Sequence, residues 1–187
     1  MKILHTGDLH LGKTLNGVDL SREQAIVLEQ LVNVCKKENV DVILIAGDIY
    51  DRSNPSGTTV EIFNAYLTVI KQHLPNVKTI IVSGNHDSEE RLNYGSSIFE
   101  LANIYVSAYP NEEQIVIGDV NFYTLPVITS VSVNNAYEEE NPSVHNSVDA
   151  VKYCIDKMKL DDNKTNILVA HQMVLPSGHE LDRSMSE

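Results

Sequence analysis

Apolar and polar positions alternate along the chain with the periods of a strand–helix–strand protein. Short apolar runs at 3–6, 41–46 and 79–82 have the length of β-strands, and the run at 41–46 (DVILIA) is continuous, as in a strand buried on both faces. Between these runs, residues 21–38 and 58–73 have apolar positions at helical spacing. This order predicts an α/β fold with buried parallel strands.

The later part of the chain predicts further elements of both kinds. They are a helix at 89–101, a hairpin with strands at 114–117 and 120–125, a helix at 147–159 and a strand at 166–170. Residues 127–146 are polar, contain three consecutive glutamates and predict a long surface loop. Ser21 followed by Gln24 predicts a capping box at the first helix. The tail 176–187 has no periodicity.

Four of the predicted strands end in the same way, because a residue of a metal-ligand type follows each apolar run. These residues are Asp8 and His10, Asp48 and Asp51, Asn85 and His86, and His171. In open α/β sheets ligands bind outside the carboxyl ends of the strands, so these side chains are expected to converge. Carboxylate, amide and imidazole groups together suit Mn²⁺, Mg²⁺, Fe²⁺ or Zn²⁺.

The spacing also suggests how two metal ions would be shared. Asp8 and His10 could face one ion if Leu9 turns away, Asp48 is placed to bridge, and Asn85 with His171 could hold the second ion. Two metals about 3.5–4 Å apart clamp a phosphoryl group and lower the pKa of a shared water. The hypothesis is therefore a two-metal hydrolase of phosphate esters.

Other polar residues near these motifs have expected roles of their own. His86 would be free to protonate the leaving oxygen, and the Asp51 carboxylate could bond His86 and orient its ring. Asp87 is expected to fix its loop rather than to bind metal. Candidates for contacts with substrate phosphates are Lys13, Arg52 and Arg91, for each of which an ordinary surface role is at least as compatible with the sequence.

Composition places the chain among ordinary globular proteins. It has 187 residues, of which 42% are apolar and 21% charged, enough for one domain with a sizeable core. The net charge of −12 has the wrong sign for a broad DNA-binding surface. If the protein nevertheless acts on DNA, either the negative charge belongs to a metal site that becomes positive when filled, or a partner or another segment binds the DNA.

Cysteine usage and the N-terminal sequence bear on location. Cys35 and Cys154 have no CxxC neighbour, which favours buried thiols in a reducing compartment. The chain starts directly with a predicted strand, without the pattern of a secretory signal, and its apolar runs are too short to span a membrane. A cytoplasmic protein without membrane contact is expected.

Four motifs in this order resemble those of a known family. They are Asp8-Leu9-His10-Leu11-Gly12, Gly47-Asp48-Ile49-Tyr50-Asp51, Gly84-Asn85-His86-Asp87 and Ala170-His171-Gln172. The chain resembles the calcineurin-like metallophosphoesterases along its whole length, and the phrases HTGDLHLGK, AGDIYDRSNP and VSGNHDS are most similar to the SbcD-type repair nucleases.

The resemblance implies an α/β sandwich of mixed β-sheets flanked by helices, and a dinuclear Mn²⁺ site with the ligands described above. His86 would be the catalytic histidine, while Asp51 stands where some relatives carry histidine. The implied activity is hydrolysis of DNA phosphodiesters, as an exonuclease on duplex ends and an endonuclease on hairpins. The implied partners are DNA, a second copy of the nuclease chain in a homodimer, and an SMC-like ATPase of the SbcC type.

The sequence departs from the family pattern at one motif. The family has a GHxH motif some tens of residues beyond the equivalent of His171, whereas Gly178-His179 lies too close and lacks the second histidine. We therefore expect residues 1–187 to be the N-terminal part of a nuclease domain, without the last motif, the capping domain and the partner-binding tail, and with little activity of its own.

Two other function classes stay open at this point. A small-molecule phosphodiesterase or a phosphatase could use the same scaffold. A non-enzymatic dimerisation module is the third possibility, with the helices at 58–73 and 89–101 as its contact surface.

Overall fold

The first β-sheet contains the three strands predicted at 3–6, 41–46 and 79–82 and a fourth that was not predicted; the first of them is an edge strand with exposed and half-buried residues, so its predicted burial is wrong. The computed structural model describes residues 1–140 and 142–174. In it, β1 (Ile3–Thr6), β4 (Val42–Ala46), β5 (Lys78–Val82) and β6 (Ile104–Ser107) form a parallel sheet in the order β1-β4-β5-β6. All five residues of β4 are buried because both faces of this central strand are covered, as its continuous apolar run predicts.

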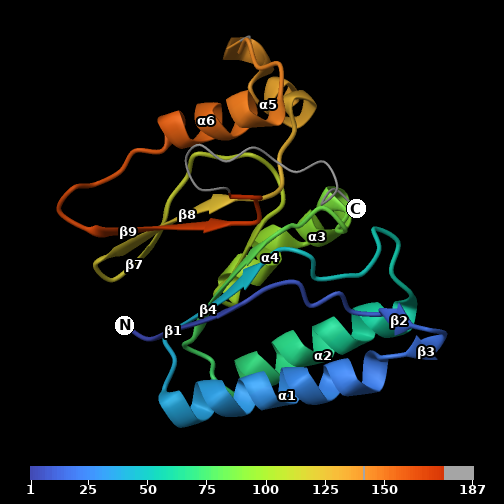
Figure 1. Cartoon of the computed structure of the whole chain (residues 1–187). Helices are drawn as coiled ribbons and strands as arrows, with labels where there is room; N and C mark the ends of the chain where they lie inside the picture. Colours follow the sequence, from blue (N-terminus) through green and yellow to red (C-terminus); the bar gives the residue numbers. More distant parts are fainter. Residues whose placement is uncertain (141, 175–187) are drawn as a thin grey trace.

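Two long helices, α1 (Ser21–Glu38) and α2 (Gly57–His73), lie side by side against one face of this sheet (Figure 1). Their bounds agree with the predicted ones to within a residue, but the predicted capping box of α1 is wrong. The N-cap residue is Leu20, and it makes no side-chain cap bond. The Asp19 carboxylate accepts from the Ser21 N–H instead, at 2.7 Å, and the Gln24 side chain is engaged elsewhere.

A second, smaller sheet packs on the other face of the first. It consists of β7 (Ile115–Ile117), β8 (Val120–Leu125) and β9 (Thr165–Ala170), with β7 antiparallel and β9 parallel to β8. Phe122 and Val169 contribute to an apolar layer shared with β4 and β5. The outer face is covered by α5 (Ser130–Ala136) and α6 (Ser147–Lys157), so the layers run helix, sheet, sheet, helix (Figure 1). The predicted sandwich of mixed sheets flanked by helices is confirmed.

The predicted surface loop at 127–146 is wrong in part, because it contains α5 and a short 3-10 helix, η1 (Glu138–Glu140). Val133 of α5 is fully buried, and Thr129 with Ser132 forms a capping box that starts the helix. Glu140 pairs with Lys157 on α6 at 2.6 Å, so the last residue of the acidic run is tied to a helix, while Glu138 and Glu139 are exposed as expected.

Three further differences concern short elements. The helix predicted at 89–101 is broken into α3 (Glu89–Asn93) and α4 (Ser96–Leu101), because Gly95 between them adopts a left-handed φ of 76°. Strands β2 (Thr14–Leu15) and β3 (Val18–Asp19) form an unpredicted hairpin. Strand β6 was also not predicted. The tail 176–187, with His179, lies outside the described residues.

Candidate metal centre

The residues singled out from the sequence lie at one end of the sandwich. The loops after β1, β4 and β5 leave the same edge of the parallel sheet, and the loop after β9 reaches this edge from the second sheet. Backbone bonds tie the first two loops together, since the Asp8 and His10 N–H groups donate to the carbonyls of Gly47 and Asp48 at 3.0 and 2.9 Å. The predicted convergence at the strand ends is observed.

Asp48 stands at the middle of this cluster and is only 3% exposed. Its Oδ2 lies 3.6 Å from Nε2 of His10, 3.6 Å from Nε2 of His171 and 4.0 Å from Nε2 of His86. Its other oxygen, Oδ1, accepts the backbone N–H of His86 at 2.9 Å. Three imidazoles from three different loops therefore surround one carboxylate oxygen.

Two of these imidazoles have their tautomers set by backbone carbonyls. Nδ1 of His171 lies 2.9 Å from the Ala46 carbonyl, and Nδ1 of His86 lies 2.9 Å from the Asp51 carbonyl. Since a carbonyl can only accept, each Nδ1 carries the proton, and in the neutral ring Nε2 keeps its lone pair toward Asp48. A histidine that bonds a carbonyl through one nitrogen and presents the other is the usual arrangement of a metal ligand.

The potential ligand atoms form two groups that share Asp48. One group contains His10, Asp48 and His86, and the other contains Asp8, Asp48 and His171. The sharing favours a bridging position for Asp48. The sequence had paired Asp8 with His10, and their ligand atoms are also close, with Oδ1 of Asp8 3.8 Å from Nε2 of His10. The division of ligands between two ions stays a prediction.

Asn85 lies on the same side as the second group. It lines an open cleft of about 550 Å³ together with Asp8, His171 and Gln172. His5 lines it too, and its side chain is exposed. Asp8 and His171 of the cluster can be reached from solvent through this cleft.

The backbone at the cluster is held in conformations that most residues avoid. Asp8, His10 and Asp48 have φ values of 52°, 43° and 48°. Gly84 and Gly47 lie beside the cluster at positions where no larger residue would fit. A Cβ on Gly84 would lie 2.0 Å from Oδ1 of Asp48, and a Cβ on Gly47 would lie 2.1 Å from Nδ1 of His171. Such strain concentrates at functional sites, where the surrounding structure maintains it.

The predicted contact between the Asp51 carboxylate and His86 is made by a different atom. His86 bonds the Asp51 backbone carbonyl, while the Asp51 carboxylate lies 3.4 Å from Nδ1 of His10. The turn after β4 directs the side chain toward the first loop, where it also lies 3.6 Å from Nζ of Lys13. Nδ1 of His10 is buried and has no hydrogen bond of good geometry among the described residues. The acidic group that lies near it is the Asp51 carboxylate.

Asp87 fixes its loop, as expected. Its carboxylate accepts the backbone N–H groups of Ile49, Tyr50 and Gly84 at 3.1, 2.9 and 2.9 Å. It thereby joins the loops after β4 and β5. Burial raises the pKa of Asp87, and the three N–H bonds act in the opposite direction.

The three basic candidates for substrate contacts differ in position. Lys13 and Arg52 lie near the cluster, where both approach the Asp51 carboxylate. The Arg52 side chain is 79% exposed, and its Nε lies 4.0 Å from Oδ2 of Asp51. Arg91 lies exposed on α3. Their contact with phosphates stays a prediction.

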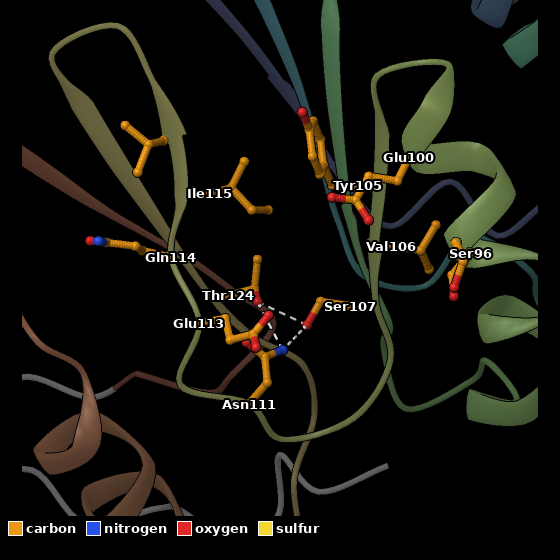
Figure 2. A pocket seen from close by; sticks show the side chains of 12 residues that line it. Ser96, Glu100, Tyr105, Val106, Ser107, Asn111, Glu113, Gln114, Ile115 and Thr124 are labelled. Atoms are coloured by element: carbon orange, nitrogen blue, oxygen red, sulfur yellow. Dashed lines mark hydrogen bonds between the residues drawn. The ribbon is translucent and has the colours of Figure 1, made fainter.

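Another cleft, of about 570 Å³, lies away from the cluster between β6, α4 and β7. Figure 2 shows the side chains of Ser107, Asn111 and Thr124 bonded to one another at its base. Its lining contains no histidine and none of the predicted ligands. The polar groups at its base satisfy one another and hold the crossover between the two sheets.

The donor set of the cluster fits divalent cations. A buried carboxylate needs compensating positive charge. Among the described residues, the ion-pair partners of Asp48 are imidazoles only, because Lys13 and Arg52 approach Asp51 instead. Two bound cations would neutralise Asp8 and Asp48 and would use the free Nε2 lone pairs.

Fold and site together define a four-layered α/β/β/α protein with a carboxylate–imidazole centre suited to two divalent metals. The sequence model of the calcineurin-like phosphoesterase family matches residues 1–185. The chain belongs to this family.

Two individual proteins are similar to the chain. The SbcD component of the nuclease SbcCD from Staphylococcus saprophyticus subsp. saprophyticus is 36% identical over 178 residues, which are 93% of this chain and 46% of that protein. The chain thus spans about half the length of this curated relative. The crystal structure of Pseudomonas putida nuclease MPE matches 68% of this chain and 55% of that chain with 19% identity and a TM-score of 0.41, too low to carry an argument.

One residue near the cluster was missed as a site residue. Gln24 bonds the backbone of the loop that carries His10 through both ends of its side-chain amide. Its only signal in the sequence was the spacing from Ser21, which favoured a helix cap.

Proposed function

We propose that the protein hydrolyses DNA phosphodiesters with two divalent cations, Mn²⁺ foremost, as part of a repair nuclease. The observation that carries the proposal is the set of imidazoles from His10, His86 and His171 around one oxygen of buried Asp48. The similarity to a component of a nuclease supports DNA as the substrate. Cleavage of duplex ends and of hairpins are the specific activities proposed.

The proposed ligands are Asp8, His10, Asp48, Asn85 and His171. The chemistry that two divalent cations supply at such a site is charge neutralisation on the phosphoryl group and activation of a water nucleophile. The protein's own contribution is to hold His171 in the tautomer whose Nε2 lone pair faces Asp48, through the Nδ1 bond to the Ala46 carbonyl.

His86 is proposed as the general acid. Its ring is 43% exposed, and Nδ1 stays bonded to the Asp51 carbonyl. A proton on Nε2 could pass to the leaving oxygen, after which the neutral ring would have the tautomer that the carbonyl bond favours. Lys13, Arg52 and Arg91 are proposed to contact substrate phosphates around this centre.

The proposed partners follow from the similarity to a protein named for a complex. They are an SbcC-type ATPase and a second copy of the chain. Among residues 1–140 and 142–174, no helix has the length and apolar character needed to cross a bilayer. A cytoplasmic location is part of the proposal.

Helices α3 and α4 are the proposed surface for the second copy. Tyr94, between the two helices, is 84% exposed, and Ile98 and Leu101 of α4 are 71% and 88% exposed. Large exposed apolar patches commonly mark interaction sites.

Activity on two substrates tests the proposed function. We expect the full-length protein to cut end-labelled linear duplex DNA with Mn²⁺ and to stop when EDTA is added. His86→Asn should lower kcat by about 10²–10⁴-fold, the usual contribution of a general acid, with Mn²⁺ affinity unchanged. His73→Asn, at the exposed end of α2, is the matched control and should leave the rate unchanged.

Two outcomes would contradict this proposal. Hydrolysis of a small aryl phosphodiester without any cleavage of DNA would favour a small-molecule phosphodiesterase or phosphatase on the same scaffold. A loss of Mn²⁺ affinity in His86→Asn would make His86 a metal ligand, consistent with its place beside His10 and Asp48, and not the acid.

A further inference from the structure

The loop that carries Asp8 and His10 needs support beyond its own sequence. Its residues Asp8, His10 and Gly12 have φ values of 52°, 43° and 85°. The left-handed conformation is strained for a non-glycine residue. The loop keeps this shape only if neighbouring groups hold its backbone.

The segment after β4 holds one side of the loop. The N–H groups of Asp8, His10 and Leu11 donate to the carbonyls of residues 47–49, and the Leu11 carbonyl accepts from the Asp51 N–H. These bonds leave the carbonyls of Leu9 and His10, and the Gly12 N–H, directed to the other side, where the His10 carbonyl also accepts the Lys13 N–H at 3.1 Å.

One side chain bonds all three of the remaining groups. Gln24, on the first turn of α1, donates from Nε2 to the His10 carbonyl at 2.6 Å and to the Leu9 carbonyl at 3.1 Å. Its Oε1 accepts the Gly12 N–H at 3.0 Å. An amide is the side chain with both donors and an acceptor at its tip, as this combination requires.

We propose that Gln24 is a positioning residue for His10 and thereby sets the affinity for the metal ion that His10 and Asp48 would hold. The inference rests on the proposed function, since it assumes that His10 and Asp48 bind a metal. Gln24 is placed to act through the backbone, because the His10 carbonyl that it bonds belongs to the same residue whose Nε2 lies 3.6 Å from Oδ2 of Asp48. Through Gln24, helix α1 would support the metal site, although none of the proposed ligands lies on this helix.

Three variants separate positioning from general stability. Gln24→Met keeps the size of the side chain and removes all three bonds. Gln24→Glu keeps an acceptor for Gly12 but places a carboxylate against the carbonyls of Leu9 and His10. Gln30→Met, at an exposed position of the same helix, is the matched control.

The measurements are Mn²⁺ titration calorimetry and Mn²⁺ electron paramagnetic resonance on the full-length protein, with hydrogen exchange of the Gly12 amide as a metal-free readout. We expect Gln24→Met and Gln24→Glu to weaken one of two Mn²⁺ sites by about 10–100-fold, as losses of outer-shell partners do. The spin-coupled signal of a metal pair should give way to that of a single ion. The Gly12 amide should lose protection in Gln24→Met and keep it in Gln24→Glu, and Gln30→Met should match the wild type throughout.

Two results would overturn the inference in distinguishable ways. If the wild type binds two Mn²⁺ ions and Gln24→Met binds them with the same affinity, Gln24 has no positioning role even if the variant melts at a lower temperature. If the wild type binds no Mn²⁺, the proposed metal centre fails and the inference fails with it.

Discussion

The position of the Asp48 side chain depends on Gly84, which packs against it and has no side chain. A Cβ on Gly84 would lie 2.0 Å from Oδ1 of Asp48 and 2.2 Å from its backbone nitrogen. Neither atom can move without shifting the carboxylate that the three imidazoles face. At the residue scale, the site therefore depends on glycines as much as on ligands.

Replacing Gly84 by alanine should disturb the site and the fold together. We expect Gly84→Ala to lower the free energy of unfolding by about 1–3 kcal/mol, as overpacking does, and to weaken Mn²⁺ binding. Chemical denaturation and titration calorimetry measure the two effects.

Gly57→Ala is the matched control, since Gly57 begins α2 and a Cβ there meets no atom within 4 Å. This variant should change the free energy of unfolding by less than about 0.5 kcal/mol. If Gly84→Ala and Gly57→Ala have the same stability and the same Mn²⁺ affinity, the loop after β5 can shift to make room for a Cβ. The close contact at Gly84 would then limit neither the stability nor the metal affinity.

At the element scale, each outer helical layer carries one buried cysteine. Cys35 lies on α1 and Cys154 on α6, and both are fully buried. Burial raises the pKa of both thiols, and that of Cys154 rises to about 11 from an ordinary value of 9.0. The thiolate, which is the reactive form, is therefore scarce in the folded protein.

We expect both thiols to resist dithionitrobenzoate at pH 8 in the native protein and to react fully in denaturant. At pH 8 a pKa of about 11 leaves roughly one thousandth of Cys154 as thiolate, and burial slows access further. Absorbance of the released thiolate measures the reaction, and Cys35→Ala and Cys154→Ala variants assign each site. Rapid native labelling of Cys154 would contradict the packing of α6 on the second sheet.

The same shift predicts how stability depends on pH. The folded pKa of Cys154 is raised above its unfolded value, so its contribution to stability is fully present below about pH 9. That contribution should decrease as the pH rises from 9 through about 11. The midpoint of urea denaturation in Cys154→Ala should vary less with pH over this window than that of the wild type.

At the scale of the whole molecule, the apolar surface of α3 and α4 predicts self-association. We expect sedimentation to show a dimer that Ile98→Glu with Leu101→Glu converts to a monomer, because charged groups on an apolar interface are costly to desolvate. Val148→Glu, 77% exposed on α6 in the opposite layer, is the control and should stay dimeric. A monomeric wild type at micromolar concentration would rule out this surface as the dimer contact.

Most of the architecture could be predicted from the sequence, because the strongest sequence patterns are local. The apolar run of β4 and the helical spacing of α1 and α2 predicted these elements to within a residue at most bounds. Segment 130–136 (SVSVNNA) has weak local preferences, and it is helical because Val133 is buried against the second sheet and Thr129 caps it. Such elements depend on partners that no window of sequence contains.

What the sequence alone determined was the set of chemical groups at the strand ends and the order in which they come, since residue type and period are local properties. Only the tertiary structure decided which atoms meet. In the folded protein the Asp51 carboxylate lies toward His10, and His86 bonds the Asp51 backbone carbonyl instead of that carboxylate. Gln24, which the sequence placed in a helix cap, bonds the loop that carries His10. The reason is that a side chain's direction depends on backbone angles and on bonding partners supplied by distant segments, and these exist only after the layers have packed.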